Sequence, residues 1–292
     1  MSACAPQPDP SHGISSEDFL KFREFFYRRT GISFESSKRY FVDKRLAERI
    51  ESTGTGTFRG YFTLLRFQAS GEELQLLTNS MTVNETYFLR EEYQFQCLVD
   101  SILPEIAKRK AGSDPIRIWC IPSSSGEEPY SIAMYLLEKW PQINEWDVEI
   151  ISSDIDTSIL RRARQGRYSI RSVQYVPPRW LAKYFKSIGD EYQLSEDLRQ
   201  AVEFTRVNLS EPADTIAYRN FDVIFCRNLL IYFDDLSRKN ATDTFYEALN
   251  PGGYICLGHS ESMSRISSLF EVRKFPEAIV YRKRLEARLE AR

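Results

Sequence analysis

The chain has 292 residues, with 39 basic and 41 acidic side chains and a formal net charge of −2. This balance argues against a general nucleic-acid binder, whose phosphate-reading surface shows as a basic excess. No apolar run approaches the roughly 20 residues of a membrane span, and no signal peptide is visible, so we expect a soluble cytoplasmic protein of about two domains.

The first 80 residues predict a small helical domain. Residues 1–13 are rich in proline and are expected to form a flexible tail. The run Ser15-Ser-Glu-Asp is typical of an N-cap followed by acidic first-turn residues, and the phenylalanines that follow it recur at helical spacing. Three further helices are predicted, at residues 36–50, 58–67 and 72–77. No strand-like alternation occurs before about residue 115.

The second predicted helix has an apolar side and a basic side. The basic residues are Lys38, Arg39, Lys44, Arg45 and Arg49. Such a basic side is either an ordinary solvated face or a surface for an acidic partner.

The remaining sequence predicts an α/β fold. A helix is expected from about residue 91 to 110. The expected strands are 116–121, 148–153, 221–226, 254–257 and 278–282, and the helices between them are 127–140, 157–164 and 236–249. This alternation indicates a doubly wound, mostly parallel sheet. Residues 166–207 break the order, and the runs 191–194 and 202–207 predict a small antiparallel β insertion that resembles a hairpin.

Cysteine and histidine usage gives no sign of a metal site. The five cysteines are scattered and never form a Cys-x-x-Cys pair, and there are only two histidines. We expect the cysteines to be small buried side chains in a reducing compartment, without a metal ion.

The loop after the first predicted strand has the composition of a ligand site. It reads Pro122-Ser-Ser-Ser-Gly126 and leads into Glu127 and Glu128 at the start of a helix. These carboxylates would repel a pyrophosphate and attract a cation, although they could equally stabilise the first helical turn. Asp154 ends the second predicted strand, where an acidic side chain accepts the hydroxyls of a ribose. A cationic nucleoside without phosphate fits this pattern, and S-adenosylmethionine is the leading candidate.

Two other patterns do not predict sites. The run Gly54-Thr-Gly56-Thr-Phe-Arg-Gly60 misses the dinucleotide-binding spacing by one residue and follows no strand, which favours a helix–helix loop. The run His259-Ser260-Glu261 lacks the glycines of a nucleophile elbow, which favours an ordinary loop after a strand.

Several motifs, in order along the chain, resemble those of the CheR-type chemotaxis protein methyltransferases. They are Asn84-Glu-Thr86-Tyr-Phe-Leu-Arg90, Ser125-Gly-Glu-Glu-Pro-Tyr-Ser131, Asn208-Leu209, Cys226-Arg-Asn-Leu-Leu-Ile-Tyr-Phe233 and Gly258-His-Ser-Glu261. The resemblance covers nearly the whole chain. It implies a helical receptor-docking domain at 14–80, a linker at 81–90, and a methyltransferase domain at 91–292 with a β-subdomain at about 166–207.

The resemblance implies transfer of a methyl group from S-adenosylmethionine to glutamate side chains of chemoreceptors, giving methyl esters and S-adenosylhomocysteine. Arg90 would pair with the methionyl carboxylate and Tyr232 would reach toward the methyl group, so these two are the catalytic candidates. Glu127 or Glu128 would approach the charged methionyl end, and Asp154 would hold the ribose. The other cofactor-binding residues that the resemblance implies are Asn84, Thr86, Asn208, Leu209, Arg227 and Asn228.

One departure from the family pattern is visible in the first loop. Pro122 stands where the family usually has a small residue, and proline removes a main-chain donor.

The partners implied by the resemblance are the acidic cytoplasmic helices of membrane chemoreceptors. The basic side of the second helix is therefore expected to dock on a receptor, and so is the 166–207 insertion; whether the insertion binds a receptor C-terminal peptide stays open. No nucleic acid and no direct membrane insertion are expected, and a monomer is the default. The alternative is a non-catalytic S-adenosylmethionine-binding module that docks on receptors, but Arg90 and Tyr232 favour an enzyme.

Overall fold

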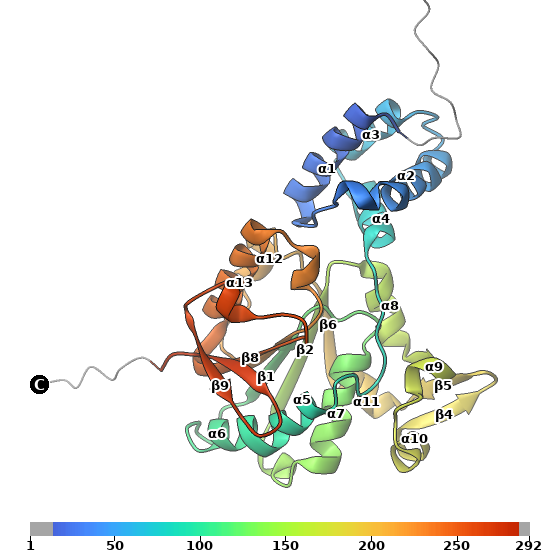
Figure 1. Cartoon of the computed structure of the whole chain (residues 1–292). Coiled ribbons are helices and arrows are strands. Elements are labelled where there is room, and N and C mark those ends of the chain that lie inside the picture. Colours follow the sequence, from blue (N-terminus) through green and yellow to red (C-terminus); the bar gives the residue numbers. More distant parts are fainter. Residues whose placement is uncertain (1–13, 286–292) are drawn as a thin grey trace, which may run out of the picture. The chain divides into compact units, whose positions relative to one another are not determined.

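The computed structural model describes residues 14–285, so the tail expected at residues 1–13 lies outside it. The chain divides between Val83 and Asn84 into two compact units, each of which is described by itself (Figure 1). None of the helices in the described residues is long and apolar enough to cross a membrane.

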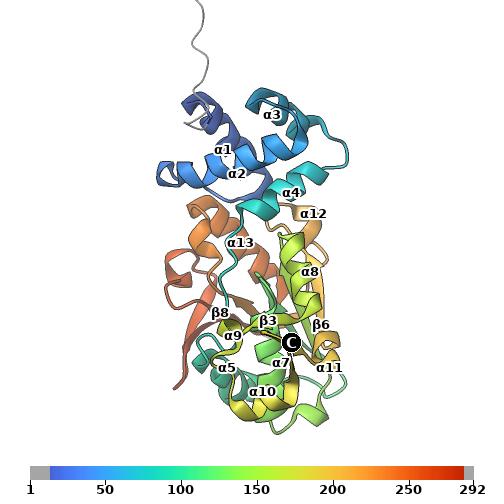
Figure 2. The same cartoon turned by 90° about the vertical axis from the view of Figure 1, so that its right-hand side faces the viewer.

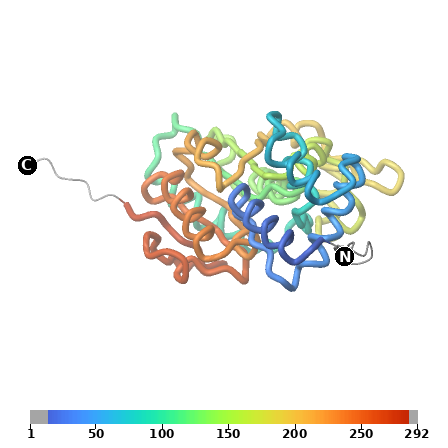
Figure 3. The backbone as a smooth tube through the Cα atoms, turned by 90° about the horizontal axis from the view of Figure 1, so that it is seen from above, coloured from blue at the N-terminus to red at the C-terminus, as the bar shows by residue number. Residues whose placement is uncertain are grey.

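The first unit is helical. Its elements are α1 (Ser16–Thr30), the 3-10 turn η1 (Ser36–Lys38), α2 (Arg39–Thr53), α3 (Phe58–Phe67) and α4 (Glu72–Met81), which Figure 3 shows from blue to cyan. Ser15 caps α1, since its hydroxyl accepts a hydrogen bond from the Asp18 amide at 3.1 Å. Phenylalanines of α1 pack with Val42 and Leu46 of α2 in one apolar core. The helices predicted from spacing are all present, and α4 is longer than expected.

The second unit contains a seven-stranded sheet in the order β6-β2-β1-β7-β8-β10-β9. The strands are β1 (Ile116–Cys120), β2 (Val148–Asp154), β6 (Val202–Arg206), β7 (Phe221–Cys226), β8 (Leu249–Leu257), β9 (Phe270–Lys274) and β10 (Ile279–Lys283). The first five are parallel in the sheet, whereas β10 is antiparallel to both β8 and β9. The strand β9 was not predicted.

Helices cover both faces of this sheet. They are α5 (Tyr93–Cys97), the π-helical η2 (Leu98–Ile102), α6 (Leu103–Ala107), α7 (Glu127–Lys139), η3 (Ile143–Glu145), α8 (Thr157–Gln165), α12 (Pro212–Thr215), η4 (Leu230–Tyr232), α13 (Asp235–Ala248) and η5 (Met263–Arg265). On one face Trp119 meets Phe245 of α13 edge-on at 5.8 Å, and on the other Phe225 lies 6.1 Å from Phe95 of α5. In Figure 2, α13 lies beside β8 and α8 beside β6. The predicted doubly wound, mostly parallel α/β fold is confirmed.

A small antiparallel sheet is inserted between α8 and β6. Its strands, in the order β3-β5-β4, are β3 (Arg167–Ser169), β5 (Glu191–Leu194) and β4 (Phe185–Ile188), accompanied by α9 (Ile170–Val173), α10 (Pro178–Tyr184) and α11 (Glu196–Gln200). The expected pairing of residues 191–194 with 202–207 was wrong. β6 joins the main sheet instead, in parallel with β2, because Val202 and Phe204 bury their side chains in the main core.

The order of the strands defines where a ligand can bind. Neighbours β2 and β7 lie on opposite sides of β1, so the chain turns in opposite directions as it leaves the middle of the sheet. At such a switch point the loops beyond the carboxyl ends of the strands separate and leave room for a ligand. The loops after β1, β2 and β7 carry most of the predicted site residues.

Candidate functional site

The loop after β1 is fixed to both neighbouring strands. The Ile121 amide donates to the Phe225 carbonyl at 2.8 Å, and the Ser123 amide donates to the Ser153 carbonyl at 2.7 Å. Pro122 lies between these two bonds, so the loop is anchored on either side of the residue that lacks an N–H. Gly126 then precedes α7 as its N-cap with φ of 92°, and a Cβ there would lie 3.0 Å from the Tyr130 ring. The sharp turn into α7 therefore requires glycine.

Asp154 is buried at the end of β2 and accepts main-chain hydrogen bonds with both carboxylate oxygens. The Ser124 amide donates to Oδ2 at 2.8 Å, and the Asp156 amide donates to Oδ1 at 3.0 Å. Burial raises the pKa of Asp154 to about 6, and the main-chain donors oppose that rise. The carboxylate thus joins the loops after β1 and β2.

The two glutamates at the start of α7 have different surroundings. Glu127 is buried, and its two oxygens accept hydrogen bonds from the hydroxyls of Ser125 and Ser172, each at 2.7 Å. Glu128 receives the Arg227 guanidinium on Oε2 at 2.8 Å, while its Oε1 is buried and has no partner among residues 14–285. Burial raises the pKa of both carboxyls, and Arg227 opposes the rise at Glu128. An unpartnered buried carboxylate oxygen is costly unless a ligand supplies a donor.

Residues 84–90 lie across the helices that follow these loops. The amide of Phe88 donates to the Ser172 carbonyl at 3.0 Å, and the amide of Leu89 donates to the Ser131 hydroxyl at 2.9 Å. The side chain of Asn84 donates to Asp156 at 3.0 Å. This segment belongs to the second unit and brings Asn84, Thr86 and Arg90 to the carboxyl edge of the sheet.

Arg227 is an internal link rather than an exposed ligand-binding arginine. It is buried, and its guanidinium contacts Glu128, the Arg90 carbonyl at 2.6 Å and Glu91 at 3.3 Å. It therefore connects the end of β7 to α7 and to the 84–90 segment. Asn208 likewise shapes its own turn, since its side-chain oxygen accepts a hydrogen bond from the Ser210 amide at 3.0 Å. Leu209 beside it is half-buried.

The loop after β7 carries Asn228 and Tyr232. Asn228 has φ of 58°, a left-handed conformation that asparagine tolerates better than most residues. Tyr232 ends η4 with 38% of its surface exposed. Its pKa is raised mainly by partial burial and further by the charge of Glu85, whereas Arg90 lowers it. Tyr232 and Arg90 are therefore within electrostatic range of one another.

Glu261 is a further residue of this site, for which the sequence predicted a loop and a family motif but no individual role. Its carboxylate accepts hydrogen bonds from the amides of Asn228, Leu230 and Gly258, at 2.8, 2.8 and 2.9 Å. The motif Gly258-His-Ser-Glu261 was the signal, but a sequence does not show that the loops after β7 and β8 meet.

The predicted basic face of α2, in the first unit, is only partly present. Arg49 forms a bidentate pair with the buried carboxylate of Glu73, at 2.6 and 2.9 Å, and the Tyr61 hydroxyl donates to the same carboxylate. Arg49 thus links helices inside the unit and is not a free docking residue, which corrects the expectation.

The other basic residues of that face divide into two arginines that contact residues of the same unit and two exposed lysines. Arg39 donates to the Ser16 hydroxyl and the Ile14 carbonyl, and Arg45 pairs with Glu48 at 3.0 Å. Lys38 and Lys44 are exposed.

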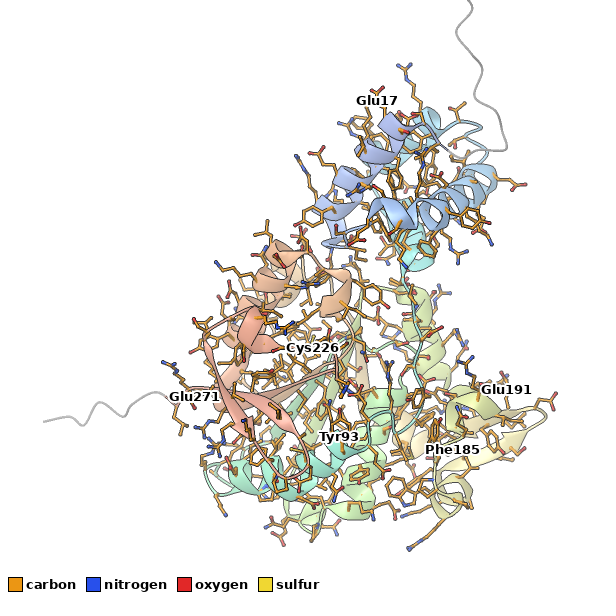
Figure 4. All side chains as sticks on the ribbon, in the orientation of Figure 1. Glu17, Tyr93, Phe185, Glu191, Cys226 and Glu271 are labelled. Carbon is orange, nitrogen blue, oxygen red and sulfur yellow. The ribbon has the colours of Figure 1, made fainter. Side chains whose placement is uncertain are left out.

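The acceptors at this edge of the sheet match, by their chemistry, a cation near Glu128 and hydroxyl groups near Asp154. The free Oε1 of Glu128 offers a buried acceptor to a positively charged donor, and Asp154 offers two partly used oxygens. Cys226, at the end of β7, marks this edge in Figure 4, whereas Phe185 and Glu191 lie on the small sheet to one side. The arrangement suits a cationic nucleoside without phosphate.

Comparison with known proteins gives one consistent result. The model of the CheR methyltransferase SAM-binding domain matches residues 84–279, and that of the CheR methyltransferase all-alpha domain matches residues 17–82. Chemotaxis protein methyltransferase 2 of Vibrio cholerae is 58% identical, over 92% of this chain and 94% of its own. Chemotaxis protein methyltransferase 2 of Pseudomonas aeruginosa is 38% identical, over 90% and 94%. The chemotaxis protein methyltransferase of Escherichia coli is 34% identical, over 89% of each chain.

The raised pKa of Asp154 predicts a pH effect on stability. Between the ordinary value of 3.8 and about 6, the unfolded chain releases this proton while the folded chain keeps it. The contribution of Asp154 to the free energy of unfolding is therefore fully present below about pH 4 and is lost as the pH rises through about 6. Carbon-13 NMR of the side-chain carboxyl, assigned with Asp154→Asn, should show a midpoint near pH 6. A midpoint below 4.5 would contradict the burial argument.

Proposed function

We propose a role for each site residue in the methylation of chemoreceptors by S-adenosylmethionine. The premise is that the chain belongs to the CheR family of chemotaxis protein methyltransferases. The acceptors are glutamate side-chain carboxylates, which become methyl esters. The observation that carries this proposal is the unpartnered buried oxygen of Glu128 at the switch point of the sheet.

Each end of the cofactor has a proposed partner. Glu128 accepts a hydrogen bond from the methionyl ammonium, because its Oε1 has no partner in the described residues, whereas each oxygen of Glu127 already accepts a hydrogen bond from a serine hydroxyl. Arg90 pairs with the methionyl carboxylate, and Asp154 accepts the ribose hydroxyls. Glu127 and Arg227 act indirectly: Glu127 holds the loop after β1, and Arg227 orients Glu128.

Five further residues complete the proposed cofactor site. Asn84 and Thr86 approach the cofactor from the 84–90 segment, and Asn208, Leu209 and Asn228 line its adenosine side. Their support is the resemblance together with their common position at the carboxyl edge of the sheet.

The chemistry needs no strong base, because a glutamate carboxylate is ionised near pH 7. The bound cofactor supplies a sulfonium methyl group, and transfer to a carboxylate gives a neutral ester and a neutral thioether. A site that excludes water favours a reaction in which charge disappears, since the reactants lose more solvation than the transition state. Holding the reacting groups in line contributes as much as ~7–11 kcal/mol. Arg90 and Tyr232 serve this alignment.

Receptor docking is proposed for the segment 157–189, in which every charged residue is basic. These exposed residues are Arg161, Arg162, Arg164, Arg167, Arg171, Arg179, Lys183 and Lys186. The segment runs from α8 through most of the small sheet and suits a partner that presents rows of glutamates. Lys38, at the end of η1, and Lys44 of α2 are exposed and are proposed for the same purpose. A receptor C-terminal peptide is a further proposed ligand of the small sheet. We propose a cytoplasmic location, since the receptor segments that become methylated are cytoplasmic. A monomer remains the proposed oligomeric state.

Glu128→Gln tests the proposed ammonium contact. The loss of a hydrogen bond to a charged group should weaken S-adenosylhomocysteine binding about 10- to 100-fold in calorimetry, equivalent to ~1.5–3 kcal/mol. Binding of 5′-methylthioadenosine, which lacks the ammonium group, should stay within twofold of the wild type. Equal losses for the two ligands would show a general distortion of the site, and no loss for either would place the ammonium elsewhere.

The methyl-transfer reaction is tested with methyl-labelled S-adenosylmethionine and membranes that contain a chemoreceptor. We expect label on the receptor that mild base releases as methanol, and a loss of that label when the acceptor glutamates are changed to glutamine. Base-stable label would contradict a carboxyl ester. No label, with normal binding of S-adenosylhomocysteine, would instead support the non-catalytic docking module.

Charge reversal tests the docking surface. Arg167→Glu with Arg171→Glu should raise the receptor KM about tenfold, because both side chains are exposed in the basic segment, and should leave S-adenosylhomocysteine affinity unchanged. Lys239→Glu with Lys274→Glu is the matched control, since it changes the net charge equally at exposed sites outside the segment. An equal rise in KM for the two double variants would show that net charge alone causes the effect and would contradict docking at this segment.

A further inference from the structure

Glu261 connects two loops that carry different parts of the site. Its Oε2 accepts from the amides of Asn228, in the loop after β7, and Gly258, at the end of β8. Its Oε1 accepts from the amide of Leu230. A single carboxylate thus receives three main-chain donors, so the two loops cannot shift relative to one another without breaking charge-assisted hydrogen bonds.

Gly258 is part of the same junction. A Cβ at this position would lie 2.8 Å from Oε2 of Glu261 and 3.0 Å from the amide nitrogen of Asn228. The first distance is shorter than side-chain carbons adopt and the second is tight, so a side chain here would displace the carboxylate and crowd the loop, and glycine lets both approach this closely. The junction therefore depends on a charge at one residue and on the absence of a side chain at the other.

The junction controls the backbone that leads to Tyr232. Leu230 begins the 3-10 turn η4, which ends at Tyr232. The amide of Leu230 is held by Glu261, and its carbonyl accepts a hydrogen bond from Nε of Arg238 at 2.9 Å. The first residue of the turn is thus fixed from both sides, while Tyr232 itself is 38% exposed. The position of the Tyr232 ring follows from the position of Leu230, because only one residue separates them.

We propose that Glu261 is a positioning residue for methyl transfer: its carboxylate sets the backbone that presents Tyr232 to the reacting groups. Glu261 has no direct role in the chemistry and acts through Tyr232. This inference rests on the proposed role of Tyr232 in the proposed function. It predicts that the effect of losing Glu261 depends on whether Tyr232 has its hydroxyl.

A double-mutant cycle on kcat tests this dependence. Glu261→Gln puts an amide donor beside main-chain donors and should lower kcat at least tenfold in the wild-type background. In a Tyr232→Phe background the same change should lower kcat less than twofold, because the hydroxyl that it positions is already gone. A merely structural role for Glu261 would lower kcat by the same factor in both backgrounds, which would overturn the inference. Wild-type kcat for Tyr232→Phe alone would instead refute the role of Tyr232.

Gly258→Ala provides a second variant that keeps every donor and acceptor of the junction. Its methyl group displaces Glu261 and Asn228 by contact alone, so it should show the same dependence on Tyr232 in kcat. If Glu261→Gln fails to fold, the comparison of kcat for Gly258→Ala in the two backgrounds tests the proposal instead. Glu271→Gln is the matched control, because Glu271 lies on β9 and pairs with Arg282 of β10, outside these loops. This variant should keep wild-type kcat. Equal kcat losses for Gly258→Ala in both backgrounds would also overturn the inference.

Discussion

Burial of negative charge at the carboxyl edge of the sheet is the constraint on which the site depends. Glu127, Glu128, Asp154 and Asp156 all lie there with little access to solvent. An ionised carboxylate in such a place costs several kcal/mol unless its oxygens receive hydrogen bonds. Serine hydroxyls, main-chain amides, Asn84 and Arg227 supply them to every oxygen of the four except Oε1 of Glu128. The remaining acceptor matches a cationic ligand.

The donors that satisfy these carboxylates also assemble the site. Asn84 and the Arg90 carbonyl belong to the segment 84–90, Ser172 belongs to α9, and Arg227 follows β7. Segments far apart in the sequence are therefore held at one edge because each contributes to the same electrostatic requirement. A cationic donor satisfies the charge of Glu128 more strongly than a neutral donor does, so the surroundings of the charge favour a sulfonium cofactor with an ammonium group. A buried site also suits a methyl transfer from a sulfonium cation to a carboxylate, because both products are neutral.

The fold was largely predictable because it depends on local pattern, whereas the site was predictable only as a set of candidates. Alternating strands and helices predicted the parallel sheet, and the small-residue loop with Asp154 indicated which edge of it is the candidate ligand site. The roles of adjacent Glu127 and Glu128 could not be separated, because they are decided by Ser172 and Arg227, which lie far along the chain. For the same reason β6 resembled half of a hairpin, and Arg49 resembled a surface residue although Glu73 binds it within the unit.

The most direct test of this account is an experimental structure of the full chain with S-adenosylhomocysteine. The account predicts the amino group of the ligand within hydrogen-bonding distance of Oε1 of Glu128, and the ribose hydroxyls on Asp154, with Glu127 still bonded to Ser125 and Ser172. A ligand whose amino group contacts Glu127 instead, or whose ribose lies away from Asp154, would contradict the claim that unsatisfied buried charge defines this site.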